Sequence, residues 1–150
     1  MENIREILGQ AKNAVILGHV RPDGDCVGSC LGLKNYLANL APELSVKVYL
    51  EEFSDSFRFL KGTEEISHDP SDGTVYDLCI ALDVSDRERL GAFASYFERA
   101  GRTVCIDHHV TNQGFAEVSH ICPDASATSE VLYTLMDDEL VDRAAAECLY

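Results

Sequence analysis

Acidic and histidine residues of this sequence gather in three short clusters, and each cluster directly follows an apolar run. The clusters are His19 with Asp23 and Asp25, then Asp83, then Asp107-His108-His109. In open α/β sheets, ligands bind just outside the carboxyl ends of the parallel strands. If the three apolar runs are such strands, four aspartates and three histidines face one crevice. Carboxylates crowded in this way repel one another unless cations neutralise them, so the pattern predicts a metal site that holds more than one ion.

The types of the ligands indicate which metals the site would take. Carboxylate and imidazole ligands without a thiolate favour Mn²⁺, Mg²⁺ or Fe²⁺ over a structural zinc held by cysteines. Two such ions can share a hydroxide and stabilise both oxygens of a phosphoryl displacement. One carboxylate usually bridges the ions, and Asp83, alone at the end of a predicted central strand, is the best candidate for the bridge.

Each cluster taken alone also has a purely structural explanation. Pro22-Asp23-Gly24 is favourable turn chemistry, and Asp25 could cap the helix that follows. Asp83, followed by Ser85-Asp86, could likewise cap the next helix. Two adjacent histidines after an aspartate are a rarer combination. The position of all three clusters at strand ends favours the functional explanation over the structural one.

The elements that must position these clusters follow from the apolar pattern. Helices are expected over residues 3–13, 25–40, 86–100, 128–136 and 144–150, with one helical turn near 57–60. Strands are expected over residues 14–17, 46–50, 78–82 and 103–106, with a weaker strand over 116–121. This alternation predicts an α/β fold with a doubly wound, mainly parallel sheet and helices on both faces. A single domain over residues 1–150 is expected.

The composition limits the classes of partner. With 12 Lys and Arg against 26 Asp and Glu, the net charge is −14, which disfavours binding to duplex nucleic acid. Metal ions could still supply the positive charge that a phosphate ester needs. No apolar run approaches the roughly 20 residues that span a bilayer, so a cytoplasmic protein without a membrane partner is expected. The six cysteines include no C-x-x-C pair and are expected to be reduced; nothing near Cys26 marks it as a nucleophile.

Four ordered motifs resemble the DHH phosphoesterase superfamily. The segment from His19 to Ser29 resembles its first motif, Asp83 fits the second, and Asp107-His108-His109 is the triplet that names the family. Residues 124–130 resemble the next segment of the branch that contains oligoribonucleases and phosphoadenosine-phosphate phosphatases. The likeness covers residues 14–150. It implies hydrolysis of very short RNA or of small nucleotides such as 3'-phosphoadenosine 5'-phosphate.

The resemblance also implies roles for single residues. His19, Asp23 and Asp83 would hold one ion, usually Mn²⁺, with Mg²⁺ as the other option. Asp25, Asp83 and His108 would hold a second ion, and a hydroxide on the metals would be the nucleophile. As catalytic residues, His109 would contact the scissile phosphate or its leaving group, and Asp107 would orient the neighbouring histidines.

Two departures from the family pattern shape the expectation for this chain. Family members supply a further aspartate from a Gly-rich segment just beyond the last residue here, and they carry a basic substrate-binding domain, DHHA1. We therefore expect residues 1–150 to be a C-terminally truncated DHH domain that folds but has low activity and a weak second metal position.

Other assignments remain open at this stage. A family II inorganic pyrophosphatase and a cyclic-dinucleotide phosphodiesterase are the nearest enzyme alternatives. An inactive metal-binding or nucleotide-binding fragment is the alternative from another class. The sequence leaves the oligomeric state undecided, with a homodimer as one option.

Overall fold

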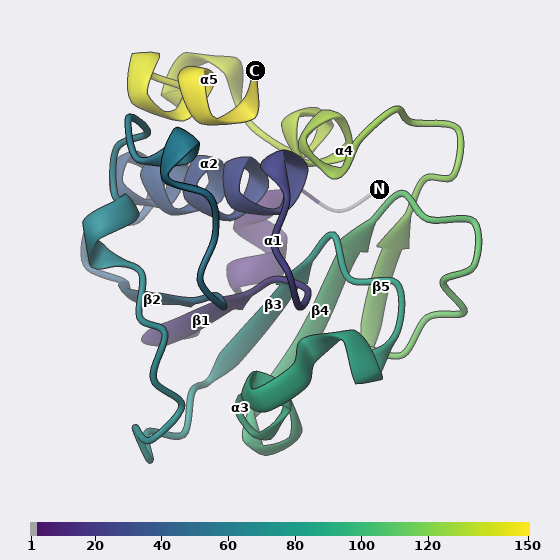
Figure 1. The fold of residues 1–150 in the computed structure, drawn as a ribbon. Coiled ribbons are helices and arrows are strands. Elements are labelled where there is room, and N and C mark those ends of the chain that lie inside the picture. The colour runs from purple at the N-terminus through teal and green to yellow at the C-terminus, as the bar shows by residue number, and fades with distance from the viewer. Residues whose placement is uncertain (1–2) are drawn as a thin grey trace.

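The computed structural model describes residues 3–150 and forms one parallel five-stranded sheet flanked by helices (Figure 1). Met1 and Glu2, which the predicted domain of residues 1–150 includes, lie outside the described residues. The strands are β1 (Asn13–Leu17), β2 (Ser45–Tyr49), β3 (Leu78–Leu82), β4 (Arg102–Asp107) and β5 (Val118–Ile121). The α-helices are α1 (Ile4–Leu8), α2 (Gly24–Leu40), α3 (Ala94–Arg99), α4 (Thr128–Thr134) and α5 (Arg143–Leu149). Short 3₁₀ helices are η1 (Asp55–Phe57), η2 (Thr63–Glu65), η3 (Arg87–Phe93) and η4 (Asp138–Leu140).

The order of the strands creates a switch point in the middle of the sheet. The strands lie in the order β2-β1-β3-β4-β5, and every neighbouring pair is parallel. The chain leaves β1 toward one edge and returns at β3 to build toward the other edge. At such a reversal the connections on the two sides diverge and leave a crevice at the carboxyl ends of the strands. Here that crevice lies between the ends of β1 and β3.

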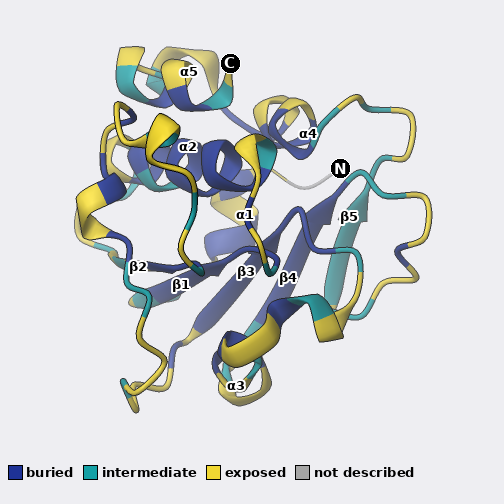
Figure 2. Ribbon diagram, viewed as in Figure 1, coloured by how far each residue is buried: buried dark blue, intermediate teal, exposed yellow. Residues whose placement is uncertain are grey.

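Helices cover both faces of the sheet, as the sequence predicted. On one face, α1, α2, α4 and α5 pack over Ala14 and Ile16 of β1 and over the residues of the other strands that point the same way. On the opposite face, η3 and α3 cover Val15 and Leu17 together with an aromatic group that includes Tyr49 and Tyr96. Because both faces are covered, β1, β3 and β4 are buried along almost their whole length (Figure 2). This double burial explains why these strands are continuous apolar runs in the sequence.

Two predicted helices differ from the structure, and a glycine accounts for each difference. The helix expected over residues 3–13 ends at Leu8, because Gly9 has φ 53° and its N–H bonds back to Arg5. The helix expected over residues 86–100 is divided into η3 and α3 by Gly91, whose φ of 58° is not helical. Glycine adopts such conformations without the steric cost that other residues incur. The remaining strands and helices lie within a few residues of their predicted bounds.

The longest helix, α2, connects the end of β1 to the core. It begins at Gly24, directly after the Pro-Asp turn, and contributes Cys26, Val27, Cys30 and Leu31 to the buried face. Its N-terminal end points toward the carboxyl ends of the central strands, and α4 approaches the same place (Figure 1). Among residues 3–150, no helix has the length and apolar character needed to cross a membrane.

Candidate metal centre

Asp83 stands at the centre of a group of carboxylates and imidazoles that lies at the switch point. It follows β3 directly, and its Oδ2 lies 3.3 Å from Nε2 of His19, which follows β1. Its Oδ1 lies 3.5 Å from Nε2 of His108 and 3.9 Å from Nδ1 of His109, both of which follow β4. The structure therefore brings the three sequence clusters together, at the ends of the strands that the apolar runs indicated.

The ring of His19 is fixed in an orientation that leaves one nitrogen free for a ligand. Its Nδ1 donates a hydrogen bond to the carbonyl oxygen of Val20 at 2.6 Å, so Nε2 faces Asp83 and Asp23. A hydrogen bond of this kind on one imidazole nitrogen is the usual way to orient the other nitrogen toward a metal. Without a cation, the hydrogen bond with Asp83 raises the pKa of His19 from 6.5 to about 9.

Asp83 itself is buried and held in an unusual backbone conformation. Only 2% of its surface is exposed, and its φ is 62°, in the left-handed region. Oδ1 accepts a hydrogen bond from the hydroxyl of Thr128 at 3.0 Å. Burial raises the pKa of the Asp83 carboxyl above its ordinary value, because the charged form loses its hydration. The charged form of this carboxyl is therefore favoured only beside a positive charge, such as a protonated imidazole or a metal ion.

The two aspartates of the first motif have different contacts. Asp23 caps α2 by accepting a hydrogen bond from the N–H of Cys26 at 3.0 Å, and its side chain is 65% exposed. Asp25 lies in the first turn of α2 and does not cap it. Its carboxylate accepts hydrogen bonds from the N–H groups of Thr128 and Ser129, at 2.9 and 3.0 Å, at the start of α4. One oxygen of Asp25 also lies 3.6 Å from Nε2 of His108.

The alternative role suggested for Asp83, that of capping the next helix, is wrong. The residue that caps η3 is Asp86, whose side chain accepts a hydrogen bond from the N–H of Arg89 at 3.2 Å. The carboxylate of Asp83 instead contacts His19, His108 and Thr128. Capping therefore does not account for an aspartate at position 83.

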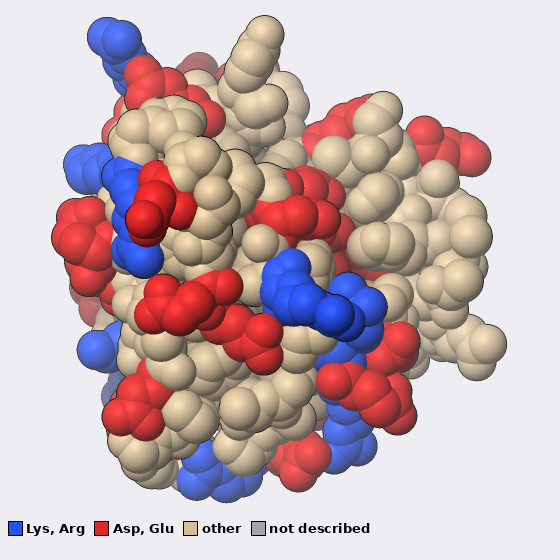
Figure 3. Space-filling model, in the orientation of Figure 1, with Lys and Arg blue, Asp and Glu red and all other residues tan. Residues whose placement is uncertain are grey.

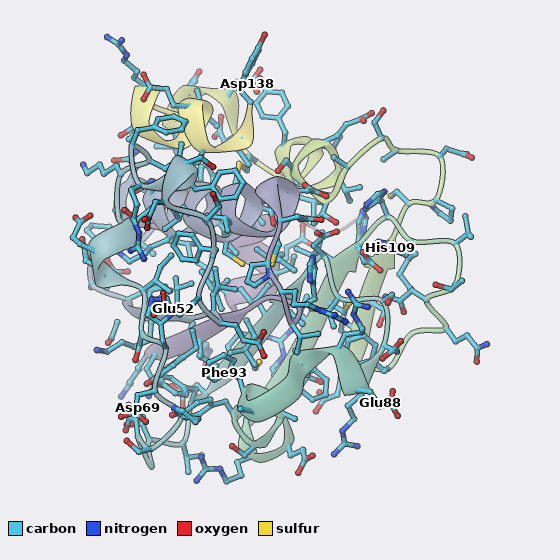
Figure 4. The ribbon with its side chains drawn as sticks, viewed as in Figure 1. Glu52, Asp69, Glu88, Phe93, His109 and Asp138 are labelled. Atoms are coloured by element: carbon cyan, nitrogen blue, oxygen red, sulfur yellow. The ribbon has the colours of Figure 1, made fainter. Side chains whose placement is uncertain are left out.

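The three residues of the DHH triplet differ in burial: Asp107 is buried, whereas His108 and His109 are partly exposed. Asp107 is fully buried and accepts hydrogen bonds from Nδ1 of His109 at 2.7 Å and from the amide of Asn112 at 2.9 Å. The ring of His109 is thereby positioned with its other nitrogen available, and 41% of the side chain is exposed. His109 lies beside the carboxyl ends of β4 and β5 (Figure 4). His108 turns the other way, toward Asp25 and Asp83.

The spacing of the donor atoms fits a cation better than direct ion pairs. Charge-assisted N–H···O bonds are about 2.7–2.9 Å long, whereas the contacts of His19 and His108 with the aspartates measure 3.3–3.6 Å. A hard cation with ligands at about 2.1 Å separates neighbouring donor atoms by about 3 Å. Two groups of donor atoms, each within 4.8 Å of one another, occur in residues 3–150. One group comprises Asp83, Asp107, His108 and His109, and the other comprises His19, Cys26 and Asp83. Asp83 belongs to both, whereas Asp23 and Asp25 belong to neither. The residues present thus fit a metal centre in which Asp83 is shared.

The electrostatics of this face agree with that interpretation. Asp and Glu side chains gather in the middle of the face, and Lys and Arg side chains lie beside them (Figure 3). An acidic centre repels a phosphate unless bound cations reverse the local charge. The centre is therefore unsuited to an anionic substrate in its metal-free state.

Four residues of the centre were not given a role from the sequence. Thr128 bonds to Asp83 across 45 residues, Ser129 bonds to Asp25 across 104, and Asn112 bonds to Asp107. The motif at residues 124–130 marked this segment, but not its contacts. Cys26 is the fourth: its sulfur belongs to a donor group with His19 and Asp83. A thiol therefore lies beside the predicted carboxylate and imidazole ligands, although the predicted ligand set did not include one.

The comparisons with known proteins agree with the fold and the motifs. The model of the DHH family, N-terminal domain, matches residues 13–150. A probable bifunctional oligoribonuclease and PAP phosphatase NrnA from Streptococcus mutans is 27% identical, over 100% of this chain and 48% of its own length. The bifunctional oligoribonuclease and PAP phosphatase NrnA from Thermus thermophilus is 29% identical, over 91% of this chain and 40% of its own.

A solved structure shows the same fold. The crystal structure of an exopolyphosphatase-related protein from Bacteroides fragilis superposes with a TM-score of 0.88 at 27% identity. The superposition covers 98% of this chain and 46% of that one. The chain thus spans about half the length of the relatives it matches.

Proposed function

This chain belongs to the DHH family, and on that premise we propose that it forms the metal-binding catalytic part of a phosphoesterase that hydrolyses short oligoribonucleotides, 3'-phosphoadenosine 5'-phosphate, or both. The observation that carries the proposal is the convergence of His19, His108 and Asp25 around the buried Asp83. The names of the relatives support the substrate class. The acidic composition argues against duplex nucleic acid as a substrate.

The proposed division of labour is the one that the family resemblance implies, and the contacts of His19 with Asp23 and Asp83 and of His108 with Asp25 and Asp83 support it. His19, Asp23 and Asp83 would hold one divalent ion, and Asp25, Asp83 and His108 would hold a second. Mn²⁺ is the proposed ion at both positions, with Mg²⁺ as the alternative. When bound, such ions supply Lewis acidity and activate water for attack on phosphorus.

The remaining residues would position the site and the substrate. Asp107 fixes the ring of His109, and the exposed edge of that ring is free to contact a phosphate oxygen or a leaving group. Thr128 orients Asp83, and the N-terminal turn of α4 orients Asp25. A proton donor at the leaving oxygen would come from His109, the most exposed imidazole of the three described above.

The first experiment tests the metal centre by itself. Metal-free protein is titrated with Mn²⁺ while heat release and thermal unfolding are followed, because an ion that binds the native state raises its stability. We expect wild type to bind and the Asp83→Asn and His108→Ala variants to lose binding. His68→Ala is the matched control, since His68 also donates Nδ1 to a backbone carbonyl and has a carboxylate near Nε2. Equal Mn²⁺ binding by wild type and Asp83→Asn would refute the proposed centre.

The second experiment identifies the substrate. The chain is incubated with Mn²⁺ and a dinucleotide, 3'-phosphoadenosine 5'-phosphate, inorganic pyrophosphate or cyclic di-AMP, with the Thermus thermophilus relative as the positive control. Turnover of the first two substrates, abolished by Asp83→Asn, supports the proposal. Preference for pyrophosphate or for cyclic di-AMP would assign the chain to one of the alternative enzymes. Metal binding without any turnover would identify a metal-binding fragment.

A further inference from the structure

A cysteine sulfur lies among the donor atoms of the proposed metal centre. Cys26 Sγ, a nitrogen of His19 and an oxygen of Asp83 all lie within 4.8 Å of one another, and all three residues are buried. Since Nδ1 of His19 is bonded to Val20, the nitrogen that faces this group is Nε2. A thiol, an imidazole and a carboxylate therefore converge from three segments: α2, the end of β1 and the end of β3.

The local structure holds the sulfur in this place. The N–H of Cys26 is bonded to the capping carboxylate of Asp23, which fixes the first turn of α2. Gly18 lies directly against the sulfur, so that a β-carbon at position 18 would collide with Cys26 Sγ and with Leu50. The glycine thus lets the end of β1 approach the helix closely and brings His19 alongside Cys26.

We propose that Cys26 is a fourth protein ligand of the ion that His19, Asp23 and Asp83 would hold, and that its sulfur raises the affinity of this position for thiophilic ions such as Zn²⁺ or Co²⁺ relative to the Mn²⁺ of the proposed function. The inference rests on the metal centre of the proposed function and deepens it. Soft thiolate ligands select zinc and similar ions, whereas hard oxygen ligands suit Mg²⁺ and Mn²⁺. On binding, the metal–sulfur bond replaces the S–H bond, and the thiol proton passes to solvent.

The simpler explanation is that Cys26 fills space as a small apolar residue. Cys30 provides the comparison, because it lies one turn further along α2, is equally buried and approaches the same glycine. It is not a member of either donor group found in residues 3–150. A purely space-filling role predicts the same behaviour for the two cysteines, and a ligand role predicts a difference.

The test uses Co²⁺, because a cobalt–thiolate bond gives a charge-transfer absorption in the near ultraviolet that carboxylate and imidazole ligands do not give. Metal-free wild type and the Cys26→Ser, Cys26→Ala and Cys30→Ala variants are titrated with Co²⁺, and circular dichroism confirms that each is folded. We expect the absorption in wild type and in Cys30→Ala, and its loss in both Cys26 variants. Zn²⁺ affinity should fall in the Cys26 variants by at least the roughly tenfold that loss of a residue supporting a ligand causes, with a much smaller change for Mn²⁺.

The outcomes separate this inference from the proposed function. If the absorption persists in folded Cys26→Ala, or wild type binds Co²⁺ without the absorption, Cys26 is not a ligand, while the metal centre stands. If wild type binds neither Co²⁺ nor Mn²⁺, both proposals fail. If the Cys26 variants lose the absorption but still bind Mn²⁺, the thiol sets the choice of metal as proposed.

Discussion

The hydroxyl of Thr128 should control how tightly the centre binds its ion. It donates a 3.0 Å hydrogen bond to Oδ1 of Asp83, and both residues are buried. Valine has nearly the same shape as threonine but lacks the hydroxyl, so Thr128→Val removes this bond together with the longer contact of the hydroxyl with Asp107 at 3.5 Å. A hydrogen bond to a charged group contributes about 1.5–3 kcal/mol. At about 1.4 kcal/mol per tenfold in affinity, Mn²⁺ binding should weaken about 10–100-fold.

The effect should be specific to the side chain of Thr128. Its N–H, which bonds to Asp25, is unaffected by the substitution, and the capping position of α4 is Ala127 rather than Thr128. Thr134→Val is the matched control, because that hydroxyl lies on the same helix but donates to the carbonyl oxygen of Val131 at 2.6 Å.

Calorimetric titration of the metal-free proteins with Mn²⁺ measures the affinities, and urea unfolding reports their stability. We expect the control to bind as wild type does. The reasoning is refuted if folded Thr128→Val binds Mn²⁺ as tightly as wild type.

Three further predictions concern stability. Asp25→Ala leaves the N–H groups at the start of α4 without their acceptor. The free energy of unfolding should therefore fall by about 1–3 kcal/mol, which a lower melting temperature would show. An unchanged melting temperature would show that α4 does not depend on this contact. Gly28→Ala places a methyl group against the carbonyl oxygen of Cys148, so the free energy of unfolding measured in urea should fall by about 1–3 kcal/mol. Gly73→Ala is the control, because a β-carbon at position 73 meets no atom within 4 Å and should leave the stability unchanged. Equal effects of the two substitutions would contradict the close approach of α2 and α5. Hydrogen bonds from Thr74, and then Tyr49, lower the pKa of Asp72 to about 2, so its stabilising effect is present above pH 3.8 and is lost as the pH falls through about 2. Asp72→Asn should therefore be less stable than wild type at neutral pH, and the difference should shrink steadily as the pH falls from 3.8 toward 2. A pH-independent difference would contradict this linkage.

The central sheet was predictable because its strands carry their signal locally. The residues of β1, β3 and β4 are apolar on both faces, so each strand appears in the sequence as a short continuous run with a polar residue at its end. Parallel pairing then places those ends side by side, and the meeting of His19, Asp83 and His108 follows from these two facts. The helical periodicity of residues 86–100 was misleading, because Gly91 interrupts the helix while the apolar residues on either side still face the core.

The contacts that complete the centre could not be predicted in the same way. The bond of Thr128 to Asp83 joins residues 45 positions apart, and the approach of Cys26 to His19 depends on the packing of α2 over the end of β1. No local pattern specifies either contact. The sequence marks the residues that end each strand, whereas the residues that reach them from other elements are known only once the helices are placed.

The conformation of Asp83 limits which residues can serve at its position. With φ at 62°, the backbone disfavours most side chains, and glycine, asparagine and aspartate are the residues that adopt it most readily. Glycine has no donor atom, and asparagine carries no charge to bind a cation strongly. Glutamate carries the charge but is poorly suited to this backbone and would extend too far between the two imidazoles. Chain geometry and coordination chemistry therefore both select aspartate, because asparagine fits the backbone without the charge and glutamate has the charge without fitting the backbone.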